Sequence, residues 1–226
     1  MRGAEHDAAW RRARLAAALL AIAAIAHVAA AAERVTPAAV WRPDAGFMQR
    51  FHAQCDARRG NAFDACFVAA MAKAGAAPAA LDFARRLDGE AYLQRLDETG
   101  GPVAVARVFY PFRANENDAW LLVNGAPPLI DVDDSHFLAL DAMRAALSYR
   151  EIERRFPNVT FWPGDRGAAR PEVRMGGQQF IVGYLLRDQC HACAVVGEAR
   201  FAFNFDHSGR LLGTRLVSVV PGVRQW

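Results

Sequence analysis

The chain has 226 residues, of which 53% are hydrophobic, and its 27 basic and 24 acidic side chains leave a formal net charge of +3. This length suits one domain with a substantial core, or one domain with a small helical cap. Four of the basic residues lie within the first 32 positions. The charge therefore gives no support to a nucleic-acid partner.

Residues 1–32 have the pattern of a secretory signal peptide. Arg11, Arg12 and Arg14 precede the uncharged run Leu15–Ala32, which ends in small residues that permit cleavage before Glu33. An uncleaved anchor is the alternative, because a run of 18 residues is at the lower limit for crossing a bilayer. We expect cleavage, with no membrane association of the mature chain, which predicts a periplasmic or secreted protein. The signal and the composition look bacterial.

Apolar residues recur at helical spacing after the signal. Residues 33–46 contain prolines and are predicted to be a loosely held lead-in segment, and residues 47–101 are predicted to be a helical subdomain. A third helix in this subdomain is expected to begin at Pro78, a residue type favoured in a first helical turn. The stripes of the first two helices are Phe47, Phe51 and Cys55, then Phe63, Phe67 and Met71.

Residues 102–226 are predicted to form an α+β domain with an antiparallel sheet. Alternating residues such as Phe201, Phe203 and Phe205 indicate a strand with one buried face, and residues 206–209 (DHSG) indicate a hairpin turn. A long helix is expected over residues 136–156, with the apolar stripe Leu138, Ala142, Ala145, Tyr149, Ile152 and Phe156. The predicted fold is therefore α+β: an antiparallel β-meander covered by a long helix, with an N-terminal helical subdomain.

Conventional catalytic motifs are missing from the sequence, which contains no Gly-x-Ser-x-Gly elbow and no His-Glu-x-x-His helix. An acidic cluster comprises Asp131, Asp133, Asp134 and residues 115–118, but it lacks the spacing of a calcium-binding EF-hand. Helix capping and solvation explain these acids, and calcium binding stays open. We predict no catalytic residue, no metal site and no cofactor, and the sequence favours a protein that is not an enzyme.

Four cysteines in an exported chain predict two disulfides. Cys55 and Cys66 lie on consecutive short helices, so that a bridge between them would clamp a helical hairpin. Cys190 and Cys193 flank two residues between strand-like runs, and their Cβ atoms would come within bonding range in a hairpin turn.

The segment Cys190-His191-Ala192-Cys193 has three further interpretations. A thioredoxin-type pair needs its first cysteine at a helix N-terminus, whereas a strand is predicted after Cys193. Haem attachment needs a histidine where Ala194 stands, and zinc needs two more ligands at suitable spacing. A disulfide-closed hairpin tip that presents His191 to a partner fits the pattern better.

The run "GGQQFIVGYLLRDQCHACAVVGEARFAFNF" resembles part of the inhibitor-of-vertebrate-lysozyme family of Gram-negative periplasmic proteins. Members of that family insert a histidine from a short disulfide-bounded loop into the lysozyme cleft. The resemblance implies that Cys190 and Cys193 close the loop and that His191 is the reactive residue. The loop here is shorter than that of the family, and the N-terminal helical region has no counterpart in it.

The predicted function is thus that of an exported binding protein with a protein partner, and the resemblance implies inhibition of a lysozyme-type cell-wall hydrolase. One alternative is a periplasmic thiol–disulfide redox protein that uses Cys190 and Cys193. Another is an envelope structural protein whose partner no motif marks. The sequence leaves the oligomeric state open.

Overall fold

The computed structural model describes residues 33–57, 59–113, 117–163, 172–174 and 176–222. Residues from Arg34 onward cluster as one compact unit. The signal-peptide prediction falls on residues 1–32, outside the described residues. Within the described part of the chain, no helix is long and apolar enough to span a membrane.

The segment expected to be a loose lead-in is held in place. It contains the 3₁₀ helix η1 (Pro37–Ala39), and Val35 and Trp41 are buried. The side-chain amide of Asn124 accepts a hydrogen bond from the Val35 N–H at 2.7 Å and donates one to the Val35 carbonyl at 2.9 Å. The prediction was wrong because it rested on local composition, whereas the partner of this segment lies far along the chain.

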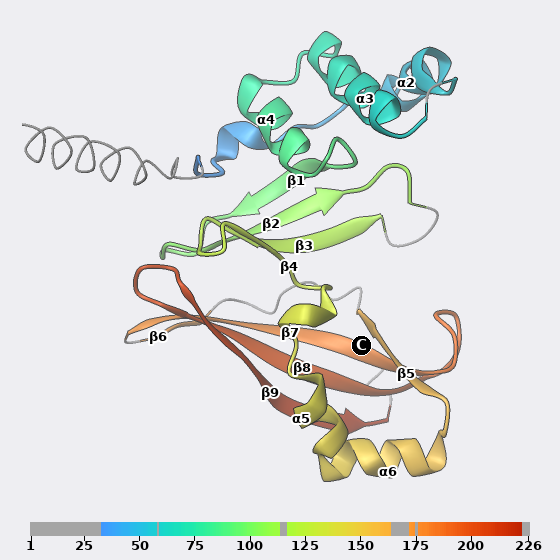
Figure 1. Ribbon diagram of the computed structural model, residues 1–226, viewed down its shortest axis with the longest axis vertical. Coiled ribbons are helices and arrows are strands. Elements are labelled where there is room, and N and C mark those ends of the chain that lie inside the picture. The colour runs from blue at the N-terminus through green and yellow to red at the C-terminus, as the bar shows by residue number, and fades with distance from the viewer. Residues whose placement is uncertain (1–32, 58, 114–116, 164–171, 175, 223–226) are drawn as a thin grey trace, which may run out of the picture. The chain divides into compact units, whose positions relative to one another are not determined.

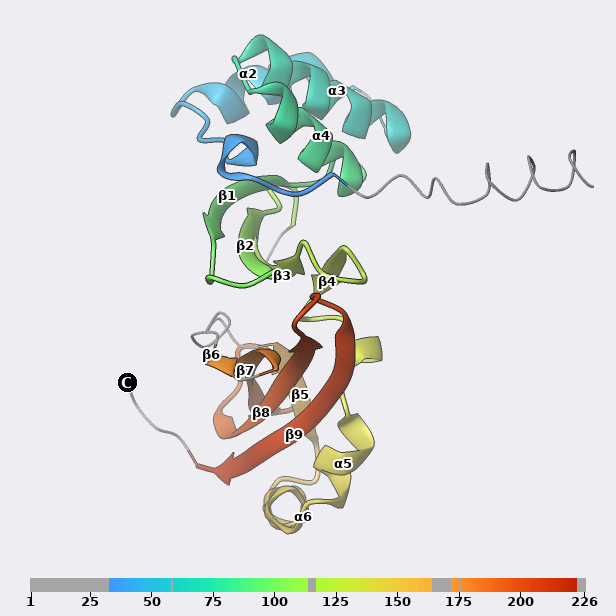
Figure 2. The ribbon, with the colours of Figure 1, turned by 90° about the vertical axis from the view of Figure 1, so that its left-hand side faces the viewer.

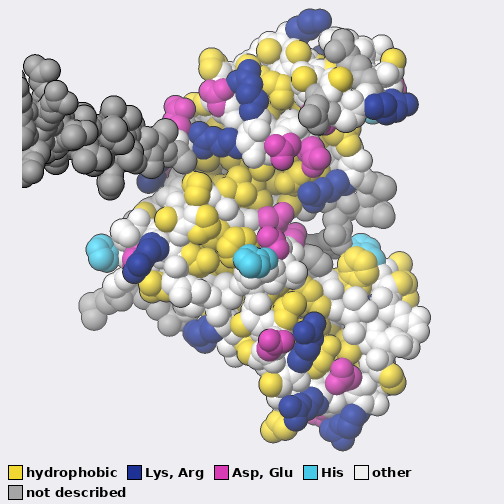
Figure 3. Space-filling view, in the orientation of Figure 1, with side chains coloured by type: hydrophobic (Ala, Val, Ile, Leu, Met, Phe, Trp, Pro, Cys, Tyr) yellow, Lys and Arg dark blue, Asp and Glu magenta, His cyan; other side chains and the backbone are white. Residues whose placement is uncertain are grey.

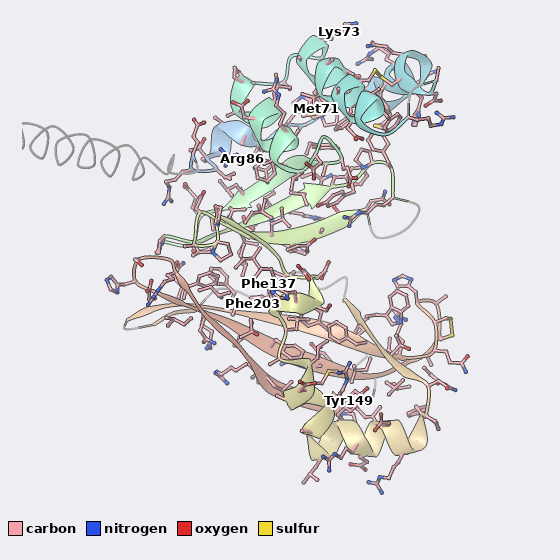
Figure 4. All side chains as sticks on the ribbon, viewed as in Figure 1. Met71, Lys73, Arg86, Phe137, Tyr149 and Phe203 are labelled. Atoms are coloured by element: carbon pink, nitrogen blue, oxygen red, sulfur yellow. A yellow bond between two sulfur atoms is a disulfide. The ribbon has the colours of Figure 1, made fainter. Side chains whose placement is uncertain are left out.

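Three helices form the N-terminal helical region, as predicted: α2 (Phe47–Cys55), α3 (Asn61–Lys73) and α4 (Pro78–Arg86). Their apolar stripes meet in one core cluster, in which Phe51 and Phe67 pack edge to face with ring centroids 5.3 Å apart. Met71 of α3 is fully buried in the same cluster (Figure 4). The disulfide Cys55–Cys66 joins the end of α2 to α3 and confirms the predicted clamp.

The first sheet begins inside the segment assigned to the helical subdomain. Strand β1 (Tyr92–Asp97) pairs with β2 (Ala104–Phe109), and the antiparallel order continues through β3 (Asp118–Val123) to β4 (Leu129–Asp131). In Figures 1 and 2, α4 lies against β1, where Phe83 packs with Leu93. The predicted boundary at residue 101 was therefore wrong. The six residues of β1 include Leu, Gln and Arg, which are also compatible with a helix.

The long helix expected over residues 136–156 is divided. The structure has a 3₁₀ helix η2 (Ser135–Phe137) and two short helices, α5 (Leu140–Ala145) and α6 (Leu147–Arg155). Ala146 separates α5 from α6 with an extended backbone (φ −65°, ψ 135°). The predicted stripe fails in its middle, where Ala142 and Ala145 are exposed and Met143 is buried instead. The two alanines made the apolar stripe look continuous in the sequence, but alanine is small enough to lie on an exposed helix face as well.

The second sheet contains the predicted meander. Strands β7 (Gly177–Asp188), β8 (Val195–Asp206) and β9 (Leu211–Pro221) are antiparallel neighbours, as Figure 2 shows. Strands β5 (Val159–Pro163) and β6 (Glu172–Arg174) both pair with β7. Helix α6 covers this sheet through Tyr149, which shares a core cluster with Phe203 of β8 (Figure 4). The α+β class is confirmed, with the cover supplied by short helices.

Residues 102–226 thus contribute to two sheets, where one was expected. The sheets share a core cluster, which includes Val105 and Leu122 of the first sheet and Phe180 of the second. Polar contacts also join them: Gln178 Oε1 accepts from the Val103 N–H at 2.8 Å, and the Tyr184 hydroxyl donates to the Val132 carbonyl at 2.5 Å. Burial raises the pKa of Tyr184 far above its usual value, so its hydroxyl stays protonated.

Candidate functional site: the disulfide-closed turn

The turn between β7 and β8 is closed twice. The disulfide Cys190–Cys193 spans it with a Cα–Cα distance of 5.0 Å, which confirms the predicted pairing. The Cys193 N–H also donates to the Cys190 carbonyl at 2.9 Å, the hydrogen bond that many β-turns contain. His191 and Ala192 are therefore the two central residues of a cross-linked turn.

Backbone contacts fix where the turn begins. Gln189 has a left-handed backbone (φ 74°), and its N–H donates to the Asn158 carbonyl at 3.1 Å, just before β5. The register of β7 and β8 shifts between Leu186 and Arg187, at the base of the turn. Such bulges bend a strand and change where the following side chains point. The chain thus enters the turn through two local departures from regular strand geometry.

His191 is only partly exposed, because one side of its ring packs on Trp162. The two ring centroids are 5.2 Å apart and the planes meet at 70°, an edge-to-face arrangement. Trp162 belongs to β5, where it lies opposite Leu185 of β7. The imidazole is consequently held in a defined place and does not project freely from the tip.

Arg187 supports the other side of the turn. Its guanidinium Nη1 donates to the Cys193 carbonyl at 2.9 Å, while its buried Nε finds no acceptor among the described residues. The sequence interpretation missed both Arg187 and Trp162. Arg187 had a usable signal, since it lies three residues before Cys190 at a strand end. Nothing in the sequence indicated that β5 would bring Trp162 to the turn.

The other predicted site residues lie elsewhere. Cys55 and Cys66 are buried in the core cluster of the helical region and do not join the turn. His207 is exposed in the β8–β9 turn, at the other end of β8 from His191. The structure therefore gathers Cys190, Cys193 and His191 into one candidate site.

The acidic residues serve local structure. Asp134 caps η2 by accepting from the His136 N–H at 2.9 Å, as predicted. Asp131 accepts from the Asp133 N–H at 2.9 Å, and burial raises the pKa of its carboxyl group. Residues 114–116 lie outside the described part. Among the described residues, we find no cluster of three or more histidine, cysteine or acidic side chains that could hold a metal ion.

Charge is dispersed on the face of the molecule shown in Figure 3. Basic and acidic side chains are interspersed there, without a continuous basic stripe. Comparison of the chain with family models, curated proteins and solved structures gave no match.

Proposed function

We propose that this protein is an exported binding protein that presents His191, on its disulfide-closed turn, to the active-site cleft of a lysozyme-type cell-wall hydrolase. One observation carries the proposal: His191 occupies the centre of a cross-linked turn and is braced by Trp162. A group that is ordered before binding loses less conformational entropy when a partner captures it. Export is supported by the two disulfides and by the signal-like pattern of residues 1–32.

The chemistry of the target supports an imidazole at this place. Glycosidases of this class use two carboxyl groups that flank the scissile bond. Such a pair attracts a hydrogen-bond donor, and an imidazole N–H can donate to either carboxylate. The turn holds two residues between its cysteines, and of these only His191 has a side chain that can donate to a carboxylate, because Ala192 ends in a methyl group.

Binding and inhibition of a panel of purified muramidases test the proposal. We expect wild type to inhibit at least one of them, and His191→Ala to weaken that binding by about 2 kcal/mol or more, the scale of an interface hot spot. His207→Ala is the matched control, because His207 is an exposed turn histidine at the opposite end of β8. Equal binding by wild type and His191→Ala, or no inhibition of any muramidase, would contradict the proposal.

A thiol–disulfide redox protein is the second candidate, and Arg187 favours it. A cation near a cysteine stabilises its thiolate, and the Arg187 guanidinium is held close to the pair by its bond to the Cys193 backbone carbonyl. The reduced pair would pass two electrons and two protons to a substrate disulfide and re-form its own bond. Strand β8 follows the turn, so no helix N-terminus is present there to stabilise a thiolate. A reduction potential well above about −300 mV would support this candidate, and a lower one would mark a structural bridge.

A further inference from the structure

Three arginines line an open cavity of about 440 Å³ at the edge of the first sheet. They are Arg42 from the lead-in segment, Arg95 from β1 and Arg107 from β2, and Tyr92 and Gln94 lie beside them. The volume is in the range that binds small molecules. We call this feature the arginine cavity. It consists of residues that the disulfide-closed turn does not use.

Packing fixes the lead-in segment against β1 and thereby places Arg42. The Trp41 N–H donates to the Leu93 carbonyl at 2.9 Å, in the manner of an added strand. The Trp41 ring packs edge to face with Phe47 and with Tyr92, at centroid distances of 4.8 and 5.1 Å. The neighbouring side chain, Arg42, is consequently carried on a rigid backbone.

The other two arginines face each other across the sheet. Arg95 is the register partner of Arg107, and Arg107 is in turn the partner of Trp120, so the three side chains form a row on one face. A register shift between Leu93 and Arg95 aligns this row. Like charges directly opposite each other destabilise a sheet, and bulges are common beside functional sites. The row is thus an arrangement that folding alone does not favour.

Two carboxylates hold the arginines in place without closing the cavity. Asp118 accepts from the Arg107 Nε at 3.2 Å and from its Nη2 at 2.8 Å, and Asp97 accepts from the Arg95 Nε at 2.6 Å. Neither aspartate lines the cavity. The exposed Arg42 side chain has no ion-pair or hydrogen-bond partner among the described residues. The cavity wall therefore keeps a net positive charge and free guanidinium N–H groups.

We propose that the arginine cavity binds a small oxyanion ligand, a molecule that carries a phosphate or carboxylate group. Guanidinium groups present planar pairs of N–H donors that match such oxygens two at a time. Arg42 supplies the unpaired charge, and Arg95 and Arg107 supply donors that their aspartates leave open. The side chains of Tyr92 and Gln94, which hydrogen-bond to each other, add neutral polar groups to the cavity wall.

Calorimetric titration of the purified chain with pyrophosphate and, separately, with citrate tests the proposal at low ionic strength. We expect saturable binding of at least one probe, and the stronger of the two identifies phosphate or carboxylate as the preferred group. Arg42→Ala should weaken that binding at least tenfold. Arg95→Lys should weaken it as well, although it keeps the charge, because the ammonium lacks the paired donors.

Arg215→Ala is the control, since Arg215 is exposed on β9 and does not line the cavity. It should bind like wild type. Both Arg42 and Arg95 are exposed, so their variants should keep the melting temperature of wild type, which circular dichroism checks. The proposal is overturned if neither probe saturates, or if Arg42→Ala and Arg215→Ala lose affinity equally, which would indicate unspecific attraction.

Discussion

At the scale of single residues, the contact between His191 and Trp162 decides how the turn is presented. An edge-to-face pair of this kind contributes about 0.5–1.5 kcal/mol beyond the area that it buries. That energy is enough to favour one position of the imidazole but not to fold the sheet. The side chain is held in place while its exposed part remains available.

We predict that Trp162→Leu releases the His191 ring. The ring-proton resonances of His191 should move toward the positions of an unpacked histidine, because the indole no longer shifts them. Trp162→Phe keeps an aromatic ring at the same position of β5 and should preserve most of the shift. Proton NMR of the histidine region measures both variants. Unchanged His191 resonances in Trp162→Leu would contradict the contact.

The candidate site could be predicted from the sequence only as far as its parts are local. Cys190, His191 and Cys193 are neighbours in the chain, so their spacing was sufficient to predict a cross-linked turn. Trp162 reaches His191 only because β5 pairs with β7, a contact between distant segments. No local pattern encodes such a pairing, and Trp162 could not be predicted.

At the scale of elements, the β8–β9 hairpin depends on one carboxylate. Asp206 accepts hydrogen bonds from the N–H groups of Ser208 and Arg210, each at 2.9 Å, and from the Ser208 hydroxyl at 2.7 Å. The Ser208 hydroxyl and the Arg210 N–H are the main causes that lower the pKa of Asp206 well below its usual value. A lowered pKa in the folded state means that ionised Asp206 stabilises the fold.

We predict that Asp206→Ala lowers the melting temperature at pH 7 and that its difference from wild type narrows at pH 3. The stabilisation is complete above the unfolded pKa near 3.8 and is lost as the pH falls toward the lower folded value. Asp141→Ala is the control, because Asp141 is exposed and its one ion-pair partner among the described residues is Arg144, at 3.5 Å. A difference that is independent of pH would show that the carboxylate charge is not involved.

The predicted elements succeeded where their signals were strong and failed where burial is supplied by distant segments. The alternating phenylalanines of β8 gave a reliable strand, and residues 206–209 gave its turn. The break at Ala146 had no signal, since alanine suits a helix interior. Strand β1 could be identified only through its partner β2, because its own six residues are compatible with either state.

At the scale of the whole molecule, two sheets share one core cluster. Val105 and Leu122 of the first sheet pack in the same cluster as Phe180 and Phe201 of the second. We therefore expect the two sheets to unfold together, in one cooperative transition. The division into two sheets could not be predicted from the sequence, since strand patterns fix which face is buried but not which strands pair.

Gln178 joins the two sheets through polar contacts. This buried side chain of β7 accepts from the Val103 N–H at 2.8 Å and donates to the Val103 carbonyl and to the Thr99 hydroxyl, at 3.1 and 2.6 Å. Gln178→Met keeps the length of the side chain but leaves the Val103 N–H buried without an acceptor. The free energy of unfolding should fall by about 1–3 kcal/mol, the cost of leaving such a group buried without a hydrogen-bond partner.

The adjacent Gln179 is the matched control: it is also buried, yet its Oε1 already lacks a partner among the described residues. Gln179→Met loses one bond to Asn204 and removes that unpaired acceptor, so its loss should be smaller. Urea unfolding followed by tryptophan fluorescence and by circular dichroism measures both variants, and an equal loss in the two would refute a bridging role for Gln178.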